Sequence, residues 1–332
     1  MSSLADAIVQ SDLDVAPRLL PAQLLHSDAQ AIEAAHELAQ VARLQAAKRD
    51  QQRKLPWSEI EQFTRSGLGS IAIPREYGGP QVSFVTLAEV FAIISAADPA
   101  LGHIPQNQFG ILNLVLGSAT EAQKKQIFKS VLDGSRIGNA GPERGSKNTL
   151  ELKARITAKG DGYVISGQKF YSTGALFAHW VAVKALDEEG RQVMAFVKRG
   201  SPGLRIVDDW SGFGQRTTAS GGVTLNAVKV PLSAVIPAHK AFDEPTADGP
   251  ISQIIQAAVD TGIAVGALEE TKRYAREARP WIDSGQDHGW QDPYSIAAIG
   301  DLEWRVAWRS PRQRRQLPLV RQRSEGFPCS RT

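Results

Sequence analysis

The chain has 332 residues, enough for two or three domains with sizeable cores, and its apolar content of 42% excludes disorder over most of its length. A single cysteine, Cys329, excludes an internal disulfide and favours a reducing, cytoplasmic compartment. The first residues lack the pattern of a signal peptide, and no uncharged apolar run reaches roughly 18 residues, so we expect no membrane span.

The net charge of +3 is unevenly distributed along the chain. Residues 305–332 hold eight arginines and one acid, whereas the rest of the chain has more acidic than basic side chains. The main body therefore has no excess positive charge to attract a phosphate backbone, which argues against a nucleic-acid partner.

Helical patterns dominate the N-terminal part. Apolar residues recur at helical spacing over residues 28–48, and Ser58 with Glu61 forms a candidate capping box for a helix that ends at Gly67. Residues 81–97 are apolar and rich in small side chains, as in a buried helix, and Asp98-Pro99 ends this pattern.

A second capping box, formed by Thr120 and Gln123, predicts a helix to about Leu132. Beyond it the sequence changes to short alternating stretches, and Asp161-Gly162 is a candidate hairpin turn between the first two. The predicted strands are residues 150–158, 162–172, 179–187, 191–198, 203–207 and 222–230.

Helical spacing returns over residues 250–278, and a further helix is predicted to begin near Pro293. Residues 305–332 then show no helical or strand period and are rich in Arg and Pro. Such a composition is typical of a GC-rich gene read out of frame, the interpretation we favour. A natural disordered tail is the alternative.

These patterns predict an α+β multidomain protein with a central antiparallel β-barrel or sandwich. The expected divisions are an N-terminal helical domain (1–135), the β domain (136–237), an incomplete C-terminal helical domain (238–304) and the atypical tail (305–332).

Two longer motifs carry a family resemblance. Residues 67–79 read Gly-Leu-Gly-Ser-Ile-Ala-Ile-Pro-Arg-Glu-Tyr-Gly-Gly, and residues 162–169 read Gly-Tyr-Val-Ile-Ser-Gly-Gln-Lys. Both resemble motifs of the acyl-CoA dehydrogenase superfamily, and the resemblance covers roughly residues 20–304. It implies that family's order of a helical domain, a β domain and further helices.

Shorter motifs resemble the superfamily's flavin-dependent monooxygenase branch, which includes dibenzothiophene monooxygenases and sulfur-acquisition oxidoreductases. That resemblance implies reduced FMN (FMNH2) supplied by a separate flavin reductase, a small organosulfur substrate and a homo-oligomer, a homotetramer in full-length relatives. The motifs are Leu101-Gly102-His103, Gly138-Asn139-Ala140, residues 171–175, Asp208-Asp209-Trp210, residues 278–281 and residues 292–294.

The resemblance also implies a cofactor site. It places Tyr171, Ser172 and Thr173 at a strand end that forms the flavin wall, where Thr173 offers a hydroxyl and a backbone N–H to flavin N5 or O4. Asn139 is expected to contact flavin or substrate, and Trp210 to cover a ring face or a phosphate. Without the resemblance, we would prefer an ordinary strand end with a satisfied hydroxyl for residues 171–173 and a core residue for Trp210.

Three further assignments depend on the same resemblance. Arg279 is expected to reach the flavin phosphate of a neighbouring subunit, or else to be a solvated residue at a helix end. His103 is expected to face the flavin and deliver a proton during the reaction with O2, because the pKa of an imidazole lies near operating pH. Asn107, where the branch usually has an aromatic residue, is expected to contact a smaller or more polar substrate.

Two alternatives stay open. One is an acyl-CoA dehydrogenase using FAD, although residues 251–259 contain no acid to act as its base. The other is an inactive, truncated remnant. The sequence has no CxxC, HExxH or GxSxG motif, so no metal site is predicted, and residues 143–147 are either a basic loop for the FMN phosphate or a solvated turn.

Overall fold

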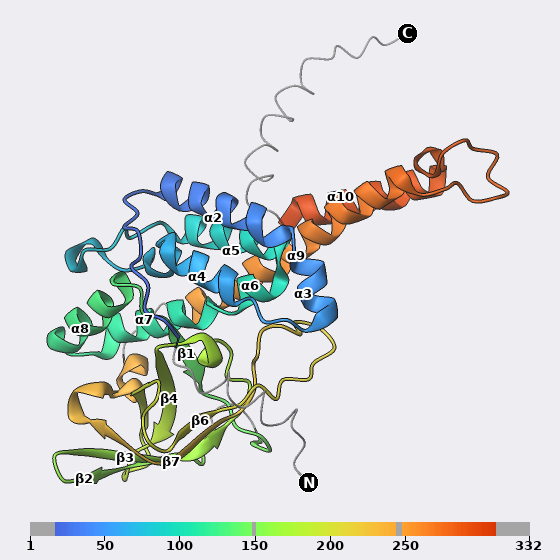
Figure 1. Cartoon of the computed structure of the whole chain (residues 1–332). Helices are drawn as coiled ribbons and strands as arrows, with labels where there is room; N and C mark the ends of the chain where they lie inside the picture. Colours follow the sequence, from blue (N-terminus) through green and yellow to red (C-terminus); the bar gives the residue numbers. More distant parts are fainter. Residues whose placement is uncertain (1–16, 148–150, 244–247, 310–332) are drawn as a thin grey trace.

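The structure is a computed structural model that describes residues 17–147, 151–243 and 248–309. Figure 1 shows a layer of helices packed on a β domain, with a long helical arm leaving to one side. The frameshift hypothesis falls largely on residues 310–332, which lie outside the described part of the chain.

The N-terminal helices match the predicted pattern, with two local differences. The α-helices of this layer are α2 (Asp28–Arg43), α3 (Ala46–Gln52), α4 (Trp57–Arg65), α5 (Phe84–Ala97), α6 (Pro99–His103), α7 (Gln106–Ser118) and α8 (Glu121–Leu132). Short 3-10 helices are η1 (Leu68–Ser70), η2 (Arg75–Tyr77), η3 (Ala175–Phe177), η4 (Leu232–Ala234), η5 (Ala238–Phe242) and η6 (Gly289–Gln291).

The helix starts show which capping predictions hold. Thr120 and Gln123 form the expected reciprocal capping box of α8. The capping box predicted at Ser58 is wrong, because Pro56 occupies the N-cap of α4 and makes no side-chain cap bond. The helix predicted over residues 28–48 is also divided, with α2 ending at Arg43 and α3 beginning at Ala46.

The β domain is an 8-stranded sheet in the order β6-β7-β3-β2-β4-β5-β8, with β1 paired to β4. Its strands are β1 (Ile137–Ala140), β2 (Arg155–Lys159), β3 (Gly162–Lys169), β4 (Trp180–Leu186), β5 (Gln192–Lys198), β6 (Leu204–Ile206), β7 (Val223–Pro231) and β8 (Val235–Ile236). Small and β-branched side chains from several strands form its core.

Two features of the sheet correct the prediction. The sheet is mixed rather than antiparallel throughout, because β1 runs parallel to β4, with Asn139 opposite Ala182. A long connection separates the two strands, and only a long crossover permits parallel pairing. The β2–β3 hairpin turns at Gly160-Asp161, one residue earlier than predicted, since Lys159 pairs with Gly162.

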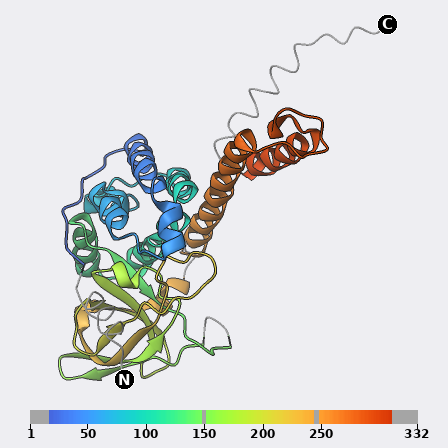
Figure 2. The same cartoon turned by 45° about the vertical axis from the view of Figure 1, so that its right-hand side comes forward.

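The C-terminal helices are α9 (Asp248–Glu277) and α10 (Pro293–Arg309). The first part of α9 packs against the helical layer, whereas its C-terminal part and α10, which contact each other, form an arm that projects from the molecule in Figure 2. The helical pattern predicted to stop after Glu303 instead continues to Arg309, with ion pairs from Lys272 to Glu303 and from Arg305 to Asp301.

The α9 helix packs along α5 through two glycines on one face. A Cβ atom on Gly262 or Gly266 would lie 2.3 Å from the backbone oxygen of Ala92 or Ala96, respectively, so the two helices approach at backbone distance. By length and composition, residues 249–277 would also suffice to cross a membrane. Ile251, Ile255 and Val259 are buried against the N-terminal helices, so core packing accounts for part of this apolar character.

Replacing Gly266 with Val is expected to lower the free energy of unfolding by about 1–3 kcal/mol, because the added side chain must push the α5 backbone away. Gly117→Ala in α7 is the control, since a Cβ there meets no atom within 4 Å. Urea denaturation measures both variants. Equal stability of Gly266→Val and the parent chain would contradict the close packing of α5 against α9.

Candidate cofactor site

A buried ion pair fixes the start of α6, the helix that carries His103. The Asp98 carboxylate accepts hydrogen bonds from the backbone N–H groups of Ala100 at 3.0 Å and Leu101 at 3.1 Å, and so caps the helix. Its other oxygen accepts from the Arg49 guanidinium at 2.6 Å, and Arg49 also contacts Glu59 at 2.5 Å. Asp98 therefore ends α5, begins α6 and is neutralised by Arg49 from α3.

His103 is the last residue of α6 and is partly buried. The Gln106 side-chain nitrogen lies 3.2 Å from its Nε2 atom and 3.3 Å from its Nδ1 atom. Burial lowers the pKa of His103 below the ordinary value, and the negative charge of Asp260 on α9 opposes this shift. A pKa below the ordinary value favours the neutral imidazole at pH 7, which presents one N–H donor and one acceptor.

Three segments that are distant in sequence meet beside His103. A Cβ atom on Gly174 would lie 2.9 Å from the Ile104 carbonyl oxygen and 3.6 Å from Gly138 Cα. The Asn139 backbone N–H donates to the Thr173 carbonyl at 3.1 Å. The loop after His103, strand β1 and the chain beyond β3 are thus in direct contact.

The predicted flavin-wall residues follow β3 in an irregular turn. Tyr171 has a φ of 54° and a side chain that is 53% exposed. Ser172 and Thr173 are buried, and the Ser172 hydroxyl has no hydrogen-bond partner among the described residues. The Thr173 backbone N–H already donates to the Tyr171 carbonyl at 2.9 Å, and its hydroxyl lies 2.8 Å from that of Ser220. The two donors expected from Thr173 are therefore both engaged within the protein.

Aromatic side chains cover the neighbouring surface. Tyr171 contacts Phe170 with ring centroids 4.7 Å apart and Trp210 at 5.8 Å. The Arg144 guanidinium carbon lies 3.6 Å from the Phe170 ring centroid, a cation–π contact. Arg53 holds the Trp210 loop by donating to the Trp210 carbonyl at 2.9 Å.

Lys169 and Glu143 form a second buried ion pair directly beside this turn. Their side chains are 0% and 3% exposed, and the Lys169 Nζ atom lies 2.7 Å from Glu143 Oε1. Glu143 also accepts from the backbone N–H groups of Lys153 and Ala154, and hydrogen bonding to these groups and to Lys169 keeps its pKa low despite burial. Glu143 is therefore a buried structural residue, whereas the sequence suggested only a basic or solvated loop.

Two predicted residues make no contact described above. Arg279 is exposed and lies two residues beyond the end of α9, on the arm. Asn107 lies in the first turn of α7, four residues after His103 and partly buried. The structure thus joins His103, Asn139, Trp210 and residues 171–173 in one region, and leaves Arg279 apart from it.

The sequence reasoning missed the buried hydroxyls of Ser220, which contacts Thr173 across 47 residues of sequence, and of Thr218, which contacts Ser220. A usable signal was present, because residues 217–222 form a run of small and hydroxylated residues before β7. It also missed Arg49 and Gln106, which hold the start of α6 and the His103 ring.

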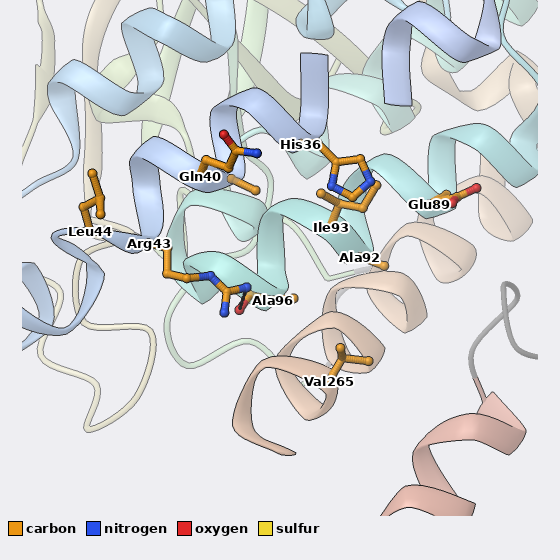
Figure 3. A pocket seen from close by; sticks show the side chains of 10 residues that line it. His36, Gln40, Arg43, Leu44, Glu89, Ala92, Ile93, Ala96 and Val265 are labelled. Atoms are coloured by element: carbon orange, nitrogen blue, oxygen red, sulfur yellow. Dashed lines mark hydrogen bonds between the residues drawn. The ribbon is translucent and has the colours of Figure 1, made fainter. Parts of the chain in front are cut away.

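A separate hollow of about 540 Å³ lies between α2, α5 and α9, as Figure 3 shows. Its labelled side chains include His36, Gln40, Arg43 and Glu89, and it shares no residue with the His103 cluster. Within the described parts of the chain, no group of three or more His, Cys, Asp or Glu residues is arranged to hold a metal ion.

The two domains that meet at this cluster match known domains in the same order. Residues 28–135 match the acyl-CoA dehydrogenase N-terminal domain, and residues 138–228 match the acyl-CoA dehydrogenase middle domain. The chain belongs to the acyl-CoA dehydrogenase family.

Among its relatives, dibenzothiophene monooxygenase of Rhodococcus erythropolis is 32% identical over 83% of this chain and 70% of that protein. The probable FMNH2-dependent monooxygenase SfnC of Pseudomonas putida is 28% identical, over 82% and 69%. The crystal structure of TdsC from Paenibacillus sp. A11-2 with FMN and indole has a TM-score of 0.75 and 30% identity, covering 83% of this chain and 72% of that one. These relatives place the chain in the monooxygenase branch of the family.

Breaking the Lys169–Glu143 pair from one side is expected to cost about 3–5 kcal/mol of folding free energy, because the remaining charge stays buried without a partner. Glu143→Gln and Lys169→Met test each side, and the double variant Lys169→Met/Glu143→Gln removes both charges and should cost less than the sum of the single changes. Denaturant unfolding of all three variants measures this coupling. Additive losses would show that the pair makes no net interaction.

Proposed function

We propose that this chain is a monooxygenase that uses reduced FMN to oxygenate a small organosulfur compound. The observation that carries the proposal is the convergence of the His103 loop, β1 and residues 171–174 on one region beside an aromatic surface. The names of the similar proteins, dibenzothiophene monooxygenase and FMNH2-dependent SfnC, support this choice of chemistry.

The residues present fit a flavin mononucleotide. Exposed Tyr171 and its partner Trp210 offer aromatic surface to an isoalloxazine ring, and the unpartnered Ser172 hydroxyl and the Asn139 side chain offer polar groups to its edge. When bound, reduced flavin supplies the electrons that activate O2. Arg144, 67% exposed beside Phe170, is the nearby cation we assign to the phosphate.

His103 is the residue we assign to proton handling at this site. Its imidazole is neutral at pH 7, so it donates through one ring nitrogen and accepts through the other. The Gln106 side chain contacts the imidazole ring, and the negative charge of Asp260 favours its protonated form. These two residues therefore set the orientation and basicity of His103. Asn107, on the following turn, is assigned to the substrate.

The activity test uses the purified chain with FMNH2, O2 and candidate organosulfur compounds such as dibenzothiophene or methanesulfinate. His103→Gln is expected to lower kcat about 10²- to 10⁴-fold, the usual contribution of a positioned acid or base. His26→Gln, an exposed histidine, is the control and should leave kcat unchanged.

Two results would overturn this function. Tight co-purification of FAD, with bleaching of that flavin by an acyl-CoA, would instead establish an acyl-CoA dehydrogenase. Absence of binding to FMN in either redox state would remove the flavin assignment for this chain. Product formation that depends on FMNH2 and O2 would support the proposal.

We further propose that the enzyme works as a cytoplasmic homo-oligomer, supplied with FMNH2 by a separate flavin reductase. Large apolar side chains are exposed along the arm, a feature typical of surfaces that bind protein. They are Tyr274, Trp281, Ile282, Trp290, Tyr294 and Ile296. Because Arg279 lies on this arm and away from its own His103 cluster, it is suited to the flavin phosphate of a second subunit.

Arg279→Ala is therefore expected to weaken FMN binding roughly 10- to 100-fold through loss of a charge-assisted hydrogen bond. Arg276→Ala, which removes an exposed cation from the last turn of α9, is the control. Flavin titration measures the affinity, and light scattering measures the assembly at each concentration. A monomer at every concentration, with unchanged FMN affinity in Arg279→Ala, would contradict the role in a second subunit.

A further inference from the structure

Three buried hydroxyls form a chain that leads to Thr173. The Thr218 hydroxyl donates to the Gln215 carbonyl at 2.9 Å. The Ser220 hydroxyl lies 2.8 Å from that of Thr218, and the Thr173 hydroxyl lies 2.8 Å from that of Ser220. The exposed fractions of Thr218, Ser220 and Thr173 are 1%, 4% and 6%, so water does not interrupt the chain.

The first member fixes the direction of every bond in the chain. A carbonyl oxygen can only accept, so the single hydroxyl proton of Thr218 is committed to Gln215. Thr218 must then accept from Ser220, and Ser220 must accept from Thr173. The proton of the Thr173 hydroxyl therefore points into the protein, and its free lone pair is an acceptor.

The backbone of Thr173 adds no donor. Its N–H donates to the Tyr171 carbonyl at 2.9 Å, and its carbonyl accepts from the Asn139 N–H at 3.1 Å. Thr173 therefore presents only an acceptor to a ligand. The neighbouring Ser172 hydroxyl is also buried, and it has no hydrogen-bond partner among the described residues.

We propose that this hydroxyl chain makes the site selective for reduced flavin. The inference rests on the proposed FMN function and adds Ser220 and Thr218 to the residues that determine it. Position N5 of the isoalloxazine ring accepts a hydrogen bond when the flavin is oxidised and carries an N–H donor when it is reduced. An acceptor fixed at Thr173 therefore pairs with the reduced ring and opposes the oxidised one.

Alternative pairings give a different outcome. Flavin O4 is an acceptor in both redox states and cannot pair favourably with an acceptor at Thr173. The N3–H group is a donor in both states, so pairing with it would give no redox selectivity. A difference in affinity between the two redox states that depends on Ser220 thus distinguishes pairing with N5 from pairing with O4 or N3–H.

The experiment measures the dissociation constants of oxidised FMN and of FMNH2, the latter under anaerobic conditions, for the parent chain and its variants. The parent is expected to bind FMNH2 more tightly. Ser220→Ala frees the Thr173 proton to donate, so oxidised FMN should bind roughly three- to tenfold more tightly, with FMNH2 little changed. Thr173→Val removes the acceptor, so FMNH2 should bind more weakly by a similar factor.

Two controls separate this effect from a loss of structure. Thr173→Ser keeps the hydroxyl and should retain the parent's preference. Thr86→Val removes another buried threonine hydroxyl, bonded to Asp28 in the first turn of α5, and should change neither constant.

The outcomes also separate this inference from the proposed function. Binding of FMN with equal affinity in both states, or equal factors of change for both states in Ser220→Ala and Thr173→Val, would overturn the selectivity and leave the flavin function standing. If neither redox state binds, both conclusions fall together.

Discussion

The contact between Arg49 and Asp98 is the constraint on which the site depends. Asp98 is buried, and an isolated carboxylate in such a place would be strongly destabilising, so the guanidinium of Arg49 is required. Because the same carboxylate caps α6, the ion pair fixes a helix rather than a single side chain. This cap therefore also fixes the position of His103, because His103 is the last residue of α6 and the helix is only five residues long.

Further contacts hold α6 in the helical layer and join that layer to the β domain. A Cβ atom on Gly102 would lie 2.0 Å from Ser95 Oγ, so α6 packs against α5 too closely for any residue larger than glycine at this position. Arg136, just before β1, donates to the Phe177 carbonyl at 2.6 Å and to Thr64 on α4 at 2.8 Å. The burial that lowers the pKa of Arg136 to about 10 leaves it charged at neutral pH. The helical layer and the β domain are thus joined by the buried hydrogen bond between Arg136 and Thr64.

How much of this was readable from the sequence depends on how local each cause is. The capping box of Thr120 with Gln123 spans four residues and was predicted correctly. Ser58 fits the same pattern and does not cap, because the chain enters the helix at Pro56. The parallel pairing of β1 depends on how the whole domain closes, which no short pattern encodes.

The candidate site shows the same difference between features with local causes and features with causes distant in sequence. The motifs containing His103, Asn139 and residues 171–173 were found by their resemblance, and the structure brings them together. Glu143 was assigned to a loop, because nothing near it in sequence shows that Lys169 neutralises it 26 residues later. The partners that determine what a side chain can donate or accept are distant in sequence, so motifs locate this site without giving its hydrogen-bond polarity.

That polarity gives the site its chemical character. Burial keeps His103 uncharged, and the hydroxyl chain fixes the proton of Thr173 without any charge at all. In a region of low dielectric, dipoles that are already oriented need no reorganisation when a ligand arrives. A site built in this way discriminates between ligands of the same shape by where they carry hydrogen, and that is how oxidised and reduced isoalloxazine rings differ along their polar edge.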